Sequence, residues 1–161
     1  MPRLLIVHHS PTPGVRTLAE SVVAGAGDDA IEGVEVVVRE ALSATADDVL
    51  AADGYLLGTT ANFGYMSGAL KHFFDTIFLE AGGALTEDGS AGAGDGGRKP
   101  YGLWVHGRYD TTGAVRSVQS IIGALPWRQA APVLEVLGEV RGPERESAYE
   151  LGGRIAALLT T

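Results

Sequence analysis

Five short apolar runs, separated by polar segments and helix-like patterns, constrain the fold of this chain most strongly. The runs are Leu4–His8, Val34–Arg39, Gly54–Thr59, Tyr101–His106 and Pro132–Leu137. The first run is apolar up to its final histidine, which is typical of a parallel strand buried on both faces. Strands that alternate with helices predict a three-layer α/β domain with a five-stranded parallel sheet. For five strands we expect right-handed crossovers and the order 2-1-3-4-5.

The composition sets limits on size, location and partners. The chain has 161 residues, of which 45% are hydrophobic and 20% charged, so we expect one domain over residues 1–161. A net charge of −8 without a basic cluster argues against nucleic acid or an anionic membrane as partner. The N-terminal apolar run is too short to cross a bilayer, so we expect a cytoplasmic protein.

Metal and thiol chemistry are not expected. The chain has no cysteine, which excludes disulfides, thiol catalysis and cysteine-bound metal. Its four histidines are scattered and lack a carboxylate pattern that would indicate a metal site.

Three polar, glycine-containing loops follow the predicted strands and precede predicted helices. They are residues 9–17, 60–66 and 107–113. In the predicted strand order the switch point lies between the first and third strands, where α/β sheets bind ligands. The first two loops should therefore face each other, and the third should join them.

The first loop is suited to binding a phosphate. It offers hydroxyl groups, a glycine that permits close backbone approach, the free N–H groups of a helix start, and one arginine. Ser and Thr before a helix are equally explained as ordinary N-caps. The residues concerned are Ser10, Thr12, Gly14, Val15, Arg16 and Thr17.

The second and third loops are suited to binding a flat ring. Phe63 and Tyr65 can stack on it, and the backbone of Thr60–Gly64 can bond its edge. The alternative is that Phe63 packs on the next helix and Tyr65 covers the surface. Tyr109 can cover another ring edge. Asp110 is better explained as a helix cap, and His106 either bonds a ligand or is satisfied at its strand end.

A helix and a long loop follow the second polar loop. The spacing of Leu70, Phe73, Phe74, Ile77 and Ala81 predicts a helix with one apolar face. Residues 82–99 are rich in glycine, and a loop of this length is usually functional or mobile.

Two segments carry a resemblance to a known family. Ser10–Glu20 resembles the phosphate loop of flavodoxin-like proteins, apart from an additional proline, Pro13, beside Thr12. Gly58–Gly68 resembles their ring-binding loop, with a Phe-Gly-x-Met-Ser signature at residues 63–67 that continues into Leu70–Asp75. The chain as a whole is similar to the branch of NADPH-dependent FMN reductases and flavodoxin-like quinone reductases.

The resemblance implies an FMN cofactor and an oxidoreductase activity. It implies hydride transfer from NAD(P)H through FMN to a quinone or similar acceptor, and no catalytic side chain is required because the flavin carries the chemistry. The first-loop residues would hold the phosphate. The ring would be held by Thr60, Ala61, Asn62, Phe63, Gly64 and Tyr65, with Gly107, Arg108, Tyr109 and Gly113 closing over it.

Two other functions, and assembly into a homo-oligomer, are also compatible with the sequence. The chain is alternatively an electron-transfer flavodoxin, or a flavodoxin-like binding module that has lost its cofactor. A homodimer or homotetramer is a further hypothesis, with the third helix and the 82–99 loop facing a second subunit. Phe74, Phe78, Trp127 and Tyr149 are the interface candidates, although each is equally a candidate for the core.

Overall fold

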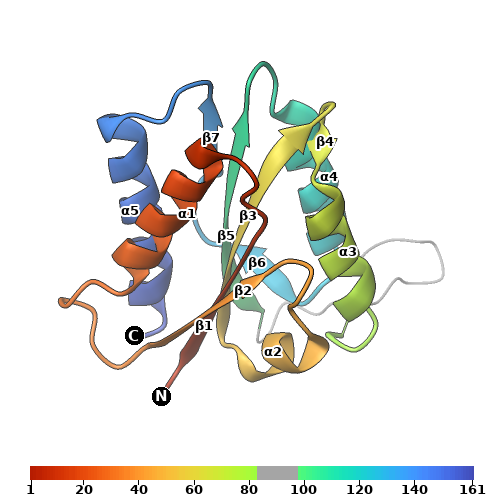
Figure 1. Cartoon of the computed structure of the whole chain (residues 1–161). Helices are drawn as coiled ribbons and strands as arrows, with labels where there is room; N and C mark the ends of the chain where they lie inside the picture. The colour runs from red at the N-terminus through yellow and green to blue at the C-terminus, as the bar shows by residue number, and fades with distance from the viewer. Residues whose placement is uncertain (83–97) are drawn as a thin grey trace.

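A parallel β-sheet runs through the centre of the computed structural model, which describes residues 1–82 and 98–161 (Figure 1). Its central strands lie in the order β2-β1-β3-β5, and the next place is shared by β6 and β7, which both pair parallel to β5. β4 forms a short antiparallel hairpin with β3. The strands are β1 (Arg3–His8), β2 (Glu35–Glu40), β3 (Gly54–Asn62), β4 (Tyr65–Met66), β5 (Lys99–Gly107), β6 (Trp127–Gln129) and β7 (Leu134–Leu137).

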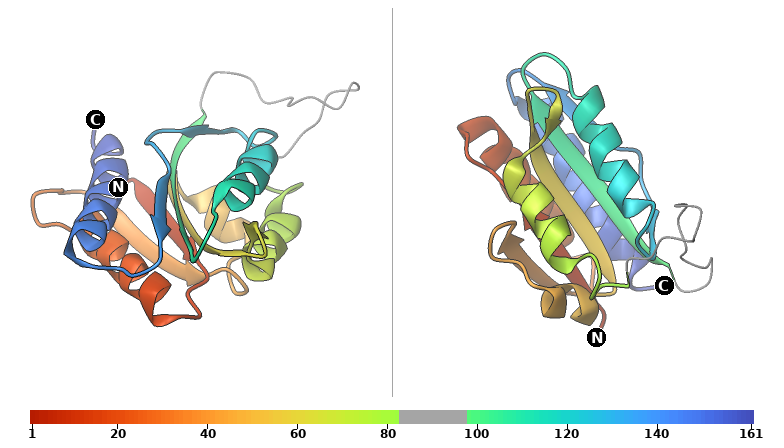
Figure 2. Two further views of the ribbon diagram at one scale, coloured as in Figure 1. Left: turned by 90° about the horizontal axis from the view of Figure 1, so that it is seen from above. Right: turned by 90° about the vertical axis from the view of Figure 1, so that its right-hand side faces the viewer.

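Five helices in the described ranges cover the two faces of this sheet (Figures 1 and 2). α1 (Pro13–Ala26) and α5 (Gly142–Leu158) lie on one face. α2 (Ala46–Ala51), α3 (Gly68–Ile77) and α4 (Thr112–Ile122) lie on the other. Two clusters of buried apolar residues fill the space between the layers, one on each side of the sheet. The predicted three-layer α/β architecture with a parallel sheet is confirmed.

The prediction of five strands is corrected to seven strands in the described part of the chain. The run expected at Pro132–Leu137 starts only at Leu134, and a separate strand, β6, precedes it. Proline has no N–H to give to a sheet ladder, so Pro132 falls in the gap between the two strands. The third strand continues to Asn62, three residues beyond the predicted end, because its last residues pair with β4.

The apolar face predicted for the third helix is confirmed. Its side chains are buried in the core between the sheet and helices α2 to α4. Two of the interface candidates, Phe74 and Trp127, belong to this same core, whereas Phe78 is half-buried and Tyr149 is exposed. The long loop predicted over residues 82–99 lies outside the described residues except at its two ends. The buried residues on α3 are Leu70, Phe73, Phe74 and Ile77, whereas Ala81 is buried in the turn beyond the helix, which ends at Ile77 rather than at Ala81.

Glycines let α1 and α5 pack with their backbones in contact. A Cβ atom on Gly25 would lie 1.9 Å from the carbonyl oxygen of Tyr149. A Cβ on Gly152 would lie 2.0 Å from the carbonyl oxygen of Val22. These distances are far below van der Waals contact, so neither position admits a side chain without separating the helices.

Gly152→Ala is therefore expected to lower the free energy of unfolding by about 2 kcal/mol. Overpacking a core costs up to about 3 kcal/mol, and alanine regains about 1 kcal/mol of helix propensity. Chemical denaturation of the two proteins measures the difference. Gly142→Ala at the start of α5 is the matched control, because its nearest described neighbour is a flexible Arg145 side-chain atom 4.0 Å away. Equal losses in both variants would contradict the close-packing explanation.

Candidate functional site

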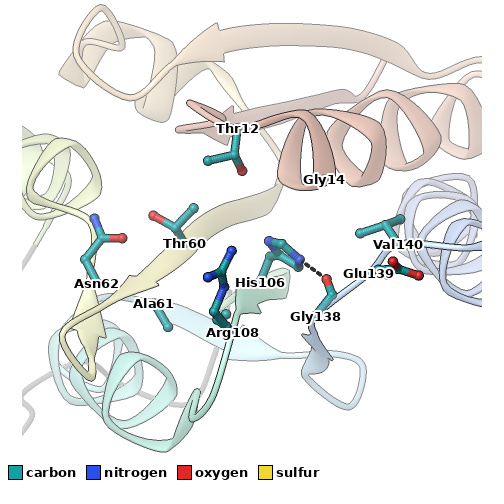
Figure 3. A pocket seen from close by; sticks show the side chains of 11 residues that line it. Thr12, Gly14, Thr60, Ala61, Asn62, His106, Arg108, Gly138, Glu139 and Val140 are labelled. Atoms are coloured by element: carbon teal, nitrogen blue, oxygen red, sulfur yellow. Dashed lines mark hydrogen bonds between the residues drawn. The ribbon is translucent and has the colours of Figure 1, made fainter.

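A cavity of about 650 Å³ opens where the carboxyl ends of the central strands meet (Figure 3). The volume is within the range typical of sites for small molecules and cofactors. Each of the three predicted loops contributes to its wall, as expected from the strand order. A fourth segment, after β7, also contributes. The lining residues are Thr12, Gly14, Thr60, Ala61, Asn62, His106, Gly107, Arg108, Gly138, Glu139 and Val140.

The start of α1 forms one side of the cavity. Thr12 is the N-cap residue, but its side chain makes no capping hydrogen bond, so the N-cap explanation does not account for it. Proline at the first helical position, Pro13, has no N–H to offer. The following amides, of Gly14 and Val15, are in the first turn, whose N–H groups have no partner within a helix. This end of α1 is thus able to receive an anion.

The side chains of the remaining first-loop residues do not line the cavity. Ser10 and Arg16 line a separate groove between α1 and β2, where the Ser10 hydroxyl lies 2.7 Å from His8 Nδ1. Burial lowers the pKa of His8. The Val15 side chain is in the core, and the Thr17 hydroxyl donates to the carbonyl oxygen of Pro13 at 3.0 Å. For these four residues only the backbone is left as a means of contacting a ligand in the cavity.

The second loop is a tight hairpin between β3 and β4 rather than the irregular loop that was predicted. Its two turn residues, Phe63 and Gly64, both have positive φ angles, of 52° and 76°. Two-residue hairpin turns of this kind strongly prefer Asn-Gly, because few side chains tolerate the left-handed region. Phe63 nevertheless occupies it, and its ring is fully exposed to solvent. Phe63 itself does not line the cavity, whereas its neighbour Asn62 does.

Buried hydroxyl groups hold the hairpin and also face the cavity. Thr59 Oγ1 donates to the carbonyl oxygen of Thr60 at 2.8 Å and accepts the amide of Ser67 at 2.9 Å. The hydroxyl of Thr60 is different: the residue is 7% exposed, and its Oγ1 has no hydrogen-bond partner among the described residues. A buried hydroxyl without a partner is costly. Thr60 lines the cavity although this oxygen is itself buried, and a ligand bound there is one source of the missing partner.

Thr60→Val is expected to act in opposite directions on stability and on binding. Without a ligand, removing the unpaired hydroxyl should raise the free energy of unfolding by about 1 kcal/mol. With a ligand, losing that hydrogen bond should weaken binding about tenfold. Thermal unfolding and a binding titration measure the two effects. Thr59→Val is the control, because that hydroxyl is fully bonded and its loss should destabilise the free protein.

The third loop packs against the hairpin and carries two exposed side chains, one of which lines the cavity. A Cβ on Gly113 would lie 1.8 Å from the carbonyl oxygen of Gly64, so the start of α4 touches the hairpin tip. Arg108 lines the cavity, and in Figure 3 its guanidinium points toward the middle. Tyr109 is exposed next to it. Asp110 accepts the amide of Thr112, the first residue of α4, at 3.0 Å, which lowers the pKa of Asp110; the N-cap residue itself is Thr111, whose side chain makes no capping bond.

The fourth segment was missed in the sequence analysis. Residues 138–140 follow β7 and complete the wall opposite the hairpin, and Gly138 donates its amide to the carbonyl oxygen of Gly107 at 2.9 Å. His106 Nε2 lies 2.6 Å from the carbonyl oxygen of Gly138. This ring nitrogen is therefore bonded within the protein, as expected for a histidine satisfied at its strand end. The signal was available, because Gly138 to Gly142 is a polar, glycine-containing loop between a strand and a helix, like the other three.

Two further properties of the described residues bear on the site. No group of three or more metal-ligating side chains is found in the described part of the chain. None of the described helices is long and apolar enough to cross a membrane.

Comparisons with known proteins agree with this architecture. No family model matches the chain. A flavodoxin from Aquifex aeolicus (strain VF5) is 34% identical over 85 residues, which is 53% of this chain and 45% of that protein. The chain thus matches less than half the length of this curated relative.

Solved structures align over almost the whole chain. The structure of a flavodoxin from the domain Archaea has a TM-score of 0.79 at 16% identity, with 99% of both chains covered. A flavodoxin, WrbA-like protein from Agrobacterium tumefaciens has a TM-score of 0.67 at 16% identity, covering 99% of this chain and 98% of that one. Such low identities establish the fold and no more. The chain therefore has a flavodoxin-like fold, an α/β architecture built on a parallel sheet.

Proposed function

We propose that the chain is an FMN-binding flavoprotein that passes a hydride from NAD(P)H through FMN to a quinone or a similar small acceptor. The observation that carries the proposal is the cavity at the sheet edge, with the buried hydroxyl of Thr60 unpaired in its wall. In α/β sheets this edge, at the switch point between β1 and β3, is the place where ligands bind. The name flavodoxin, carried by the Aquifex relative and the archaeal structure, supports the same class of protein.

The cavity has the donors that FMN requires. The start of α1 provides N–H groups for the phosphate, despite the loss of one donor at Pro13. Phe63 and Tyr109 are exposed aromatic rings on the two loops that flank the cavity, and they would stack on or border the isoalloxazine. The Thr60 hydroxyl and the β3–β4 hairpin would bond polar atoms of the cofactor. The residues present therefore fit this group.

The protein's part in the reaction would be to bind and orient. FMN, when bound, supplies the hydride-transfer chemistry, and the fold positions it and sets its electrostatic surroundings. The hairpin, fixed by Thr59 and Gly113, would hold the ring in place. Arg108 would place a positive charge at the cavity, although the net charge of the whole chain is −8. No side chain is assigned as a catalytic acid or base.

An electron-transfer flavodoxin is the second candidate function. It is favoured by the flavodoxin relative and by the acidic charge, since such a carrier would dock on basic partners. The two candidates differ in whether NAD(P)H reduces the bound flavin directly.

Anaerobic mixing of the FMN-loaded protein with NADH and with NADPH separates them. For the reductase we expect bleaching of the flavin absorbance within seconds, and its return when a water-soluble quinone is added. Free FMN at the same concentration is the control. If the bound flavin is not reduced by either nucleotide faster than free FMN, the reductase proposal is wrong and the carrier is retained.

We also propose that the chain forms a homodimer or homotetramer in which α3, with the neighbouring α4, faces a second subunit; residues 82–99, the other part of the expected interface, lie largely outside the described residues. A shallow groove of about 280 Å³ lies between these helices, with the half-buried Phe78 and Ile121 in its wall. Light scattering at high protein concentration tests this assembly. A monomer throughout the concentration range would exclude it.

A further inference from the structure

The imidazole of His106 is held in one tautomer. Its Nε2 atom lies 2.6 Å from the carbonyl oxygen of Gly138. A carbonyl oxygen can only accept a hydrogen bond, so Nε2 carries the hydrogen. The other ring nitrogen, Nδ1, lies on the side of the ring away from Gly138 and faces the cavity (Figure 3). Nδ1 is therefore an acceptor when the ring is neutral and a donor when the ring is protonated.

This ring lies directly against the start of α1. A Cβ on Gly14 would be 3.0 Å from His106 Cε1 and 3.3 Å from Nε2. An anion at the N-terminus of α1 would thus be a close neighbour of the imidazole. The helix start has one amide donor fewer than usual because Pro13 is its first residue, so an anion there needs a donor from outside the loop.

Two further polar groups converge on the same space. The unpaired hydroxyl of Thr60 is more than nine-tenths buried and lines the cavity together with Thr12 and His106. The guanidinium of Arg108 forms no ion pair with any described residue, and it points toward the middle of the cavity in Figure 3. The buried hydroxyl is an observation independent of the helix terminus, and it can pair with a polar atom of a ligand as donor or as acceptor.

We propose that His106 selects a phosphate-bearing flavin, with Nδ1 taking up a proton from solvent and donating it in a hydrogen bond to the phosphate. This inference rests on the proposed function, since it assumes that a flavin occupies the cavity. No covalent bond forms or breaks: neutral imidazole and a solvent proton become an imidazolium paired with the phosphate. The phosphate loop itself would add backbone donors but no charged side chain, because Arg16 faces the groove beside β2.

The charged groups around the imidazole are compatible with proton uptake on phosphate binding. Arg108, from the loop after β5, lines the same cavity as the imidazole. Glu139, from the loop after β7, is paired with Arg141 at 2.6 Å and is exposed. A bound phosphate would bring a negative charge to the space that His106 and Arg108 both face, and an opposite charge nearby favours the charged form of an imidazole.

Affinities for FMN and for riboflavin, which lacks the phosphate, test the proposal. The variant is His106→Gln, since a glutamine amide can still donate to Gly138 but cannot be protonated. We expect it to lower the preference for FMN over riboflavin by at least about tenfold, the value of one hydrogen bond to a charged group. Riboflavin affinity should stay unchanged. His72→Gln on the exposed side of α3 is the matched control and should leave both affinities unchanged.

Calorimetry of the wild-type protein provides a second readout. FMN binding is measured at pH 8, where the phosphate is already ionised, in two buffers of different ionisation enthalpy. We expect proton uptake with FMN and none with riboflavin. An unchanged preference in His106→Gln, or no uptake in the wild type, overturns the inference. If neither flavin binds the wild type, the proposed function itself fails. If His106→Gln does not fold, the uptake measurement decides alone.

Discussion

Gly113→Val is expected to lower the affinity for FMN about 100-fold. A Cβ at this position would lie 1.8 Å from the carbonyl oxygen of Gly64, a backbone atom that cannot rotate away. The start of α4 and the tip of the β3–β4 hairpin must then separate by more than 1 Å, and displacements of about this size in a binding site cost about 100-fold. Fluorescence titration of FMN measures the loss.

Gly68→Ala is the control for this variant. Gly68 is the first residue of α3, just after the hairpin, and no described atom lies within 4 Å of its Cβ position. This substitution should leave binding unchanged, with stability equal or slightly higher because alanine favours the helix. If Gly113→Val bound FMN as tightly as Gly68→Ala does, the hairpin would not be part of the flavin site.

Phe63→Asn is expected to stabilise the free protein and to weaken FMN binding. Phenylalanine at a φ of 52° is strained by about 1 kcal/mol, and asparagine is the residue that tolerates this conformation best. The exposed ring, in contrast, is available for stacking, which contributes about 2 kcal/mol per stacked base in comparable sites. We therefore expect a higher melting temperature together with an affinity about 30-fold lower.

The contrast with another exposed apolar residue makes this expectation specific. Leu79, beyond the end of α3, is also largely exposed, but no residue next to it in the sequence lines the cavity, whereas Asn62 next to Phe63 does. Leu79→Asn should leave FMN affinity unchanged. A variant Phe63→Asn that is more stable and still binds FMN normally would show that the ring serves some other purpose than stacking on the flavin.

The sequence was sufficient to predict the layers of the fold and the side of the sheet on which the cavity lies. Uninterrupted apolar runs specify buried parallel strands, and the loops that follow such strands necessarily meet at one edge. The hairpin was missed because its turn carries Phe63-Gly64 where Asn-Gly would be the familiar signal. The split of the last strand depends on Pro132 and on pairing with β5, which local patterns do not reveal.

Side-chain directions were the least predictable part of the site. Gly14 and Arg16 are two residues apart on α1, which turns their side-chain positions to different sides of the helix. Gly14 consequently faces the cavity, while Arg16 faces β2. The bond from His106 to Gly138 joins the end of β5 to the loop after β7, 32 residues further along the chain, so no local sequence motif predicts it.

The most direct test of the flavin site is a titration of the purified protein with FMN, followed by quenching of flavin fluorescence. We predict saturable quenching with one FMN per chain, stronger than with riboflavin. A folded protein that quenches neither FMN nor FAD would contradict the account, and the chain would then be a flavodoxin-like domain without its cofactor.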